Sequence, residues 1–424
     1  MLEKIFAFAV ILYSMGMATA VIYPHLSAQD YAEAQGAVHW PVAIVQTVIY
    51  GLGAVLVLAN WQRVAGAALR IWPILLLLAL APISALWSLD PGITLRRSGI
   101  LLGTASLAIY MGERYSMEEY ASMLIKAFSL NMVASLILHF VAPVFTTDQD
   151  AHFGAWKGLS GHKNSFGAHM AIAVILILLF NFKQRKLLRY FLLLLALGEL
   201  YLSHCSTGRA ACAVSLAVIP FFQLARLPQK LRVPAYIFSF LLLSGVALAA
   251  FANSAVLLGL LGRDATFTGR TEIWAQLLAA VGHRPWLGFG FECFWTGVRG
   301  ECLDVIIASG WLVPEAHNGF IEMAVDFGLL GIGVMIFALG STFKNAFEFI
   351  RSQRGLFGFW PMAFMFFYLV HSLGESDLLT KNSVSVMIFL TISTRMALDL
   401  HRKKAQASVR FSVQAGEPLT ALVA

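Results

Sequence analysis

The sequence predicts an all-α integral membrane protein with about twelve transmembrane helices, because apolar stretches of the ~20 residues that cross a bilayer recur along the chain. Of the 424 residues, 59% are hydrophobic and 12% are charged, whereas a soluble domain has about 25% charged residues. The mean hydropathy is +0.75. The expected spans lie at 5–24, 40–60, 71–87, 96–112, 120–142, 166–182, 188–204, 208–226, 233–252, 318–341, 357–373 and 380–398.

These spans divide the chain into four parts. Residues 1–252 hold the first nine spans, 253–317 a large loop, 318–400 the last three spans and 401–424 a polar tail that is expected to be disordered from Lys403. The first span has no small-residue cleavage site after a short apolar core, so it is expected to remain as a helix rather than act as a signal peptide.

The net charge of +7 is distributed unevenly. Basic residues cluster in alternate loops, and the positive-inside rule places those loops and both termini in the cytoplasm. This accounts for the basic loops by topology alone, and we expect no nucleic-acid partner. The basic residues concerned are Arg63, Arg70, Lys183, Arg185, Lys186, Arg189, Arg226, Lys230, Arg232, Lys344, Arg351, Arg354, Arg402, Lys403 and Lys404.

Arginines in the opposite loops run against this rule and therefore indicate a function. Arg209 stands in the first turn of the eighth span, after Ser206 or Thr207 as N-cap. Arg270 begins a predicted amphipathic helix, 270–282, with Trp274, Leu277, Leu278 and Val281 at helical spacing on the membrane or the bundle. A helix N-terminus and a forked guanidinium both suit phosphate.

Other polar groups sit where spans begin on the same side. Gly161-His162-Lys163-Asn164 enters the sixth span, as contact residues or as a helix cap. Arg96 and Arg97 at the fourth span either line the site or snorkel to lipid phosphates. His317 and Asn318 precede the tenth span, with Glu322 one turn later. Histidine is the usual proton acceptor near neutral pH, so His317 is the candidate base, with Asn318 or Glu322 orienting its ring.

No metal site is indicated. Asp148, Asp150 and His152 hold no established ligand spacing and are expected to be solvated. The four cysteines form no CxxC site. Cys293 and Cys302 share the outer loop, where a disulfide between them is one option.

Taken together, the motifs resemble the O-antigen ligase and Wzy-type polysaccharide polymerase superfamily. The resemblance extends from about Trp87 to Gly331 and depends on the order of several short motifs around the largest outer loop. These are Trp87-Ser88 with Asp90-Pro91, Gly161-His162-Lys163-Asn164 with Gly167, Ser206 with Gly208-Arg209, Gly262-Arg263-Asp264, Thr268-Gly269-Arg270-Thr271 with Trp274, Arg284-Pro285 with Gly288 and Gly290, and His317-Asn318 with Gly328 and Gly331.

The resemblance implies a GT-C-type glycosyltransferase of the bacterial inner membrane with a periplasmic site. The donor would be a glycan on undecaprenyl pyrophosphate, with no cofactor and no metal. Arg209 and Arg270 would hold the pyrophosphate, and His317 would activate the acceptor hydroxyl for an inverting attack. Further candidates for substrate contact are Arg97, His162, Lys163, Asn164, Arg263, Arg284, Asn318 and Glu322.

Two functions within this superfamily differ in the acceptor of the glycan. The His-Lys-Asn and Thr-Gly-Arg-Thr-x-x-Trp motifs look most like the ExoQ-like polymerase branch, whose acceptor is another lipid-linked repeat and whose partners include a chain-length copolymerase. The His317-Asn318 motif with Gly328 also fits a ligase that transfers glycan to lipid A-core. A twelve-span transporter and a metal-dependent glycosyltransferase are alternatives of other classes, but repeated halves are not visible and paired acids in the outer loops are sparse.

The topology yields the first prediction. Alkaline phosphatase fused within 253–316 should be active because that loop is expected in the periplasm, and fused after Lys186 it should be inactive. Enzyme activity of the two fusions, normalised to protein level, is the measurement. The reverse pattern would place the large loop in the cytoplasm, where the expected donor is absent.

Overall fold

The computed structural model describes residues 1–23, 40–149, 153–237, 270–295, 300–310 and 312–415. Within these ranges the chain is helical, and the only β-type pairing is an isolated bridge between Thr147 and Trp156. The all-α prediction is therefore confirmed. The ninth span at 233–252, Arg263 and the Thr268-Gly269 part of the loop motif lie largely or wholly outside the described residues.

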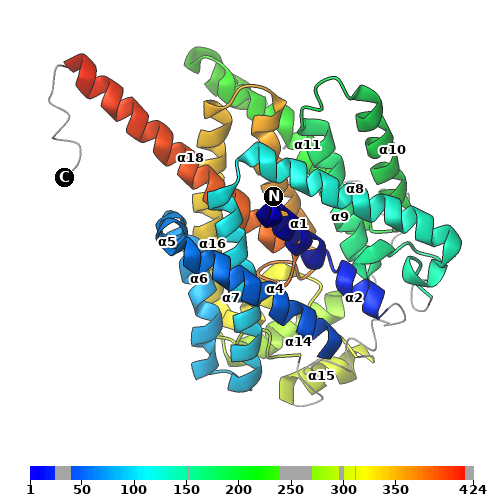
Figure 1. Ribbon diagram of the computed structural model, residues 1–424. Helices are drawn as coiled ribbons and strands as arrows, with labels where there is room; N and C mark the ends of the chain where they lie inside the picture. Colours follow the sequence, from blue (N-terminus) through cyan, green and yellow to red (C-terminus); the bar gives the residue numbers. More distant parts are fainter. Residues whose placement is uncertain (24–39, 150–152, 238–269, 296–299, 311, 416–424) are drawn as a thin grey trace.

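The helices of the first half follow the predicted spans closely (Figure 1). They are α1 (Leu2–Ser14), α2 (Met17–Ile22), α4 (Trp40–Ala59), α5 (Trp61–Leu69), α6 (Trp72–Ile83), α7 (Pro91–Arg114) and α8 (Met117–Val141). α5 was not predicted: it lies in the expected loop after the second span, and it makes an angle of 102° with α6.

The second half has α9 (Lys163–Leu179), α10 (Lys186–Leu202), α11 (Ser206–Gln223), α14 (Arg270–His283), α15 (Gly300–Ser309), α16 (Gly319–Ser352), α17 (Trp360–His371) and α18 (Val384–Ala415). Four helices in the described ranges, α4, α8, α16 and α18, are each long and apolar enough to cross a membrane. These helices support a membrane protein, and the total of about twelve spans stays a prediction.

The core is built around α9, whose side chains from Phe166 to Ile177 are almost all buried. It packs against α8, α10, α11 and α17. Gly167 lets α11 approach closely, because a Cβ there would lie 2.3 Å from the Cβ of Cys205. This close packing brings the first turns of α9 and α11 together.

A break in α16 receives a turn of the outer loop. Gly328 has φ +60° and ψ −155°, which interrupts the helix. The turn docks there: the N–H groups of Phe289 and Gly290 donate to the carbonyls of Val325 (2.8 Å) and Asp326 (3.0 Å). Gly288 and Gly290, two glycines of the motif that begins at Arg284, are therefore required because other atoms of the chain approach them closely.

α14 and α15 lie together at one end of the bundle (Figure 1). The predicted helix at 270–282 is confirmed, and it packs on α16 and α15. Its buried residues are Ile273, Leu277 and Ala280, whereas Leu278 is 56% exposed. The buried face is thus turned slightly from the expected one, and it shares one apolar cluster with Cys302 and Val305 of α15, a helix that the sequence did not predict.

The expectation that the tail is disordered from Lys403 is wrong, because α18 continues to Ala415. Lys403 Nζ donates to the Ser352 carbonyl at 2.8 Å, and Lys404 lies 3.0 Å from Glu348. These contacts with the end of α16 support the extension. Cys293 and Cys302 are both buried thiols with no disulfide between them.

The break in α16 can be tested with Gly328→Ala. An alanine Cβ would lie 2.5 Å from the Trp286 carbonyl carbon, at backbone angles that are essentially restricted to glycine. We expect a loss of about 1–3 kcal/mol of stability or more, seen as a lower Tm in detergent. Gly333→Ala in the same helix is the control, because nothing lies within 4 Å of its Cβ position. Equal Tm values for the two variants would contradict this role.

Candidate functional site

The segment between α17 and α18, residues 372–383, gathers the predicted site. Three helix starts are bonded to its backbone or side chains. The Gly319 N–H donates to the Ser372 carbonyl at 2.7 Å, and Arg270 Nη1 donates to the Gly374 carbonyl. We call residues 372–383 the α17–α18 loop.

Glu375 of this loop is the central side chain. It is 6% exposed, and its Oε1 accepts hydrogen bonds from Asn164 Nδ2 at 2.8 Å and from Arg270 Nη2 at 3.3 Å. Its Oε2 lies 3.8 Å from His317 Nδ1. One carboxylate thus joins the N-terminal ends of α9, α14 and α16. Burial opposes ionisation, but the hydrogen bond and charge of His317, with the charges of His371 and Arg270, lower the pKa of Glu375 to about 2.

His317 lies between two carboxylates. Its Nδ1 is 2.9 Å from Glu315 Oε1 and 3.8 Å from Glu375 Oε2, and its side chain is 17% exposed. Burial would lower the pKa of His317, but the charges and hydrogen bonds of Glu315 and Glu375 raise it to about 10. The imidazole is therefore protonated at neutral pH in this structure.

Asn318 and Glu322 hold the backbone around His317. Asn318 Oδ1 accepts from the backbone N–H of Phe320 at 3.0 Å and so caps α16. Glu322 accepts from the Ala316 N–H at 2.7 Å, from the Trp295 indole at 2.6 Å and from the Ser376 hydroxyl at 3.1 Å. The expected ring-orienting role falls instead to Glu315 and Glu375, which the sequence reasoning missed.

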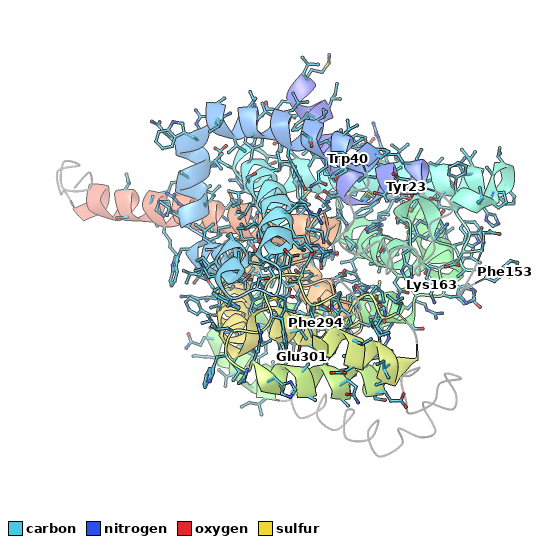
Figure 2. The ribbon with its side chains drawn as sticks, turned by 90° about the horizontal axis from the view of Figure 1, so that it is seen from below. Tyr23, Trp40, Phe153, Lys163, Phe294 and Glu301 are labelled. Atoms are coloured by element: carbon cyan, nitrogen blue, oxygen red, sulfur yellow. The ribbon has the colours of Figure 1, made fainter. Side chains whose placement is uncertain are left out.

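The His-Lys-Asn group lies at the start of α9 (Figure 2, Lys163). His162 caps this helix, because its Nδ1 accepts from the Asn164 N–H at 3.3 Å. Burial lowers the pKa of His162 below its usual range, so the ring is neutral at pH 7. With Nδ1 accepting, Nε2 carries the proton. The structure shows the capping role, and a contact of His162 with substrate stays a prediction.

Arg209 is exposed in the first turn of α11. Its N-cap is Cys205, whose Sγ accepts from the Gly208 N–H at 3.3 Å, rather than the expected Ser206 or Thr207. The guanidinium lies 6.0 Å from the centre of the Tyr201 ring and borders an apolar groove of about 480 Å³ between α9, α10 and α11. Arg209 Nη2 donates to Ser206 Oγ at 3.5 Å, whereas in the described part of the chain the cations that pair with Glu375 are Arg270 and His317.

Arg97 and Arg284 hold the outer loop in place. Arg97 is 8% exposed, donates to the Glu292 carbonyl and lies 3.9 Å from its carboxylate, which Lys381 also contacts. Arg97 is therefore paired with protein rather than snorkelling. Arg284 Nη1 donates to the Trp87 carbonyl at 3.3 Å and stacks over Phe289. Phe294 and Glu301 of this loop region are labelled in Figure 2.

One group among the described residues brings potential metal ligands together: atoms of Glu315, His317 and Glu375 lie within 4.8 Å of one another. The two carboxylates already face two cations, His317 and Arg270. Charge balance in the cluster is thus reached with the chain's own residues.

The fold and site define a membrane protein of several apolar helices with charged side chains gathered at one end. The sequence model of the family described as "O-Antigen ligase" (Wzy_C) matches residues 191–336, a range that includes Arg209, Arg270 and His317. The chain is 24% identical to the exopolysaccharide production protein ExoQ of Rhizobium meliloti over 375 residues, 84% of each protein. It is 32% identical to the O-antigen ligase of Pseudomonas aeruginosa over 89 residues, 20% of this chain and 19% of the ligase. The predicted resemblance to the O-antigen ligase superfamily is confirmed.

The central role of Glu375 predicts a measurable loss in Glu375→Gln. The amide keeps the shape but leaves Arg270 and His317 without their buried counter-charge, and a hydrogen bond to a charged group contributes about 1.5–3 kcal/mol. We expect a lower Tm. We also expect looser packing of α14 on α16, measured as faster proteolysis of the outer loop. Glu272→Gln, an exposed glutamate on α14, is the control and should behave as wild type. An unchanged Tm in Glu375→Gln would argue against the central role.

Proposed function

We propose that the chain is a metal-independent, inverting glycosyltransferase that polymerises undecaprenyl-pyrophosphate-linked repeat units into exopolysaccharide or O-antigen. We propose that the reaction occurs at the periplasmic face of the bacterial inner membrane, in a GT-C-type fold with both termini in the cytoplasm. The observation that carries the proposal is the linked set of His317, Glu375 and Arg270. His317 and Arg270 lie inside the range matched by the O-antigen ligase family, and Glu375 lies beyond it.

Donor binding is assigned to Arg270 and Arg209. Two of the five N–H donors of Arg270 face Gly374 and Glu375, which leaves others for pyrophosphate oxygens. Arg209 is exposed at the rim of the apolar groove, whose lining is chiefly leucine. A polyprenyl chain in that groove would bring its pyrophosphate to Arg209. This arrangement supports an anion clamp of two forked donors.

The chemical step requires a neutral His317. The acceptor hydroxyl oxygen attacks the anomeric carbon opposite the pyrophosphate, the bond from that carbon to pyrophosphate breaks, and the hydroxyl proton passes to the imidazole. Undecaprenyl pyrophosphate leaves with the bonding electron pair. With a pKa near 10, about one His317 in a thousand is neutral at pH 7. The flanking carboxylates thus make a strong base that is mostly protonated at rest.

The acceptor is proposed to be a second lipid-linked repeat. Similarity to ExoQ over 84% of both chains favours a polymerase, with a chain-length copolymerase as partner. Transfer to lipid A-core uses the same donor chemistry, and the shorter match to an O-antigen ligase keeps it as the alternative. A transporter is not favoured, because the charged cluster gathers at one end of the bundle.

The reaction is tested with the purified chain in nanodiscs and a synthetic undecaprenyl-pyrophosphate repeat unit. We expect longer lipid-linked glycan, equally with and without EDTA, and no transfer to added lipid A-core. Arg209→Lys and Arg270→Lys should each reduce turnover, because lysine keeps the charge but loses the forked geometry. Glycan on lipid A-core instead would identify a ligase, and normal turnover of both variants would remove the clamp.

The charge state of His317 predicts the pH dependence. If the neutral ring is the base, turnover should rise about tenfold per pH unit from pH 7 to 9 and level near pH 10. Glu315→Gln removes one carboxylate, so the plateau should begin at lower pH. His317→Ala should lose roughly 100- to 10,000-fold and keep donor binding.

Glu301→Gln is the control, because Glu301 lies 3.6 Å from another histidine of the same outer loop, His283. Its profile should match wild type. A rate that stays flat from pH 7 to 9 would show that His317 acts as a fixed cation rather than as a base.

A further inference from the structure

A basic pocket is lined by residues of α5, the C-terminal end of α7 and α18. α5 and α18 lie away from α14 and α15 (Figure 1). It has a volume of about 290 Å³. Six polar side chains border it: Gln62, Arg63, Arg70, Glu113, His401 and Arg402. None of them takes part in the proposed reaction, and the positive-inside rule places them at the cytoplasmic surface.

The pocket carries an excess of positive charge. Three arginines face a single carboxylate, that of Glu113. Arg70 is fixed over α5, because its Nη1 donates to the Gly66 carbonyl. Guanidinium groups gathered around one cavity repel one another unless an anion lies between them. Their forked N–H groups match the oxygens of a phosphate.

Topology alone does not require this convergence. Basic residues that orient a span need only lie near its cytoplasmic end. Here Arg63 and Arg402 stand at distant places in the sequence, and the packing of α5 against α7 and α18 brings them to one cavity. Val64 and Ala67 are the buried residues of α5 that make this packing.

The surroundings of the pocket fit a membrane lipid. α5 makes an angle of 102° with α6, and large apolar side chains around this bend are exposed: Trp61 is 60% exposed, Leu69 68% and Trp72 51%. Exposed tryptophans beside arginines are typical of the interface where headgroups meet acyl chains. A soluble inorganic anion has no apolar part that could contact these side chains, whereas a phospholipid has acyl chains.

We propose that this pocket binds the phosphate headgroup of an anionic phospholipid, held by Arg63, Arg70 and Arg402, with its acyl chains along Trp61 and Leu69. The lipid would fix α18 to α5 on the cytoplasmic side. The proposal is independent of the proposed reaction, because it concerns the opposite surface and a binding event only.

The test measures lipid retention by native mass spectrometry of the full chain, exchanged into nanodiscs with phosphatidylglycerol or with phosphatidylcholine alone. The wild type should retain phosphatidylglycerol, and the Arg63→Gln, Arg402→Gln double variant should retain at least tenfold less. Lys183→Gln with Arg185→Gln is the control, since it removes two exposed cations from the α9–α10 connection. Equal retention by the wild type and the pocket variant would overturn the proposal.

A second pair of measurements separates the remaining outcomes. If the glutamine variant does not fold, Arg63→Lys with Arg402→Lys keeps the charge and should still lose part of the retention, because the forked geometry is gone; full retention by that variant would overturn the proposal. Inorganic phosphate at millimolar concentration should not displace the lipid. Displacement by phosphate would identify a pocket for a soluble anion instead.

Discussion

The buried carboxylate of Glu375 is the interaction on which the candidate site depends. It receives Asn164, Arg270 and His317 from three helices that are far apart in the sequence. Burying a carboxylate costs several kcal/mol, which is offset here by close opposite charges and hydrogen bonds. The same interaction sets the register of α9, α14 and α16, so the position of the clamp arginine and the charge of the histidine are fixed together.

The two carboxylates beside His317 make it a less suitable base near neutral pH, because they keep it protonated. A general base works best with a pKa near the operating pH, whereas two carboxylates hold the pKa of His317 near 10. The two partners differ in access: the Glu315 side chain is 38% exposed, that of Glu375 only 8%. In the proposed reaction, an entering acceptor would displace the more exposed Glu315 while Glu375 keeps the ring in place. Losing one carboxylate lowers the pKa of His317 toward the working range.

Much of the fold was predictable, because hydropathy reports each span locally. Helix starts also singled out Arg270 and His317, which the structure brings together at Glu375, since a charge beside a free N-terminus is visible in the sequence. The role of Glu375 could not be predicted, because in the sequence it is one acidic residue of an outer loop. Its importance comes from three helices, distant in the sequence, that meet there. The exchange of roles between Glu322 and Glu315 was hidden for the same reason. In the sequence, Glu375 is visible only as one of two acidic residues, with Asp377, shortly after an apolar span.

The glycine motifs after α14 and within α16 help to hold α14 in place, because both ends of this helix are bonded to other parts of the chain. Its N-terminus is held by the bonds of Arg270 to the α17–α18 loop. After its C-terminus, Arg284 reaches the Trp87 carbonyl, and the following turn docks into the break of α16 at Gly328. The C-terminal side of α14 is therefore tied to α16, and its N-terminal end is tied to Glu375, which also contacts His317 just before the start of α16. The arginine and the histidine therefore share one rigid frame, which is what a reaction that depends on fixed distances requires.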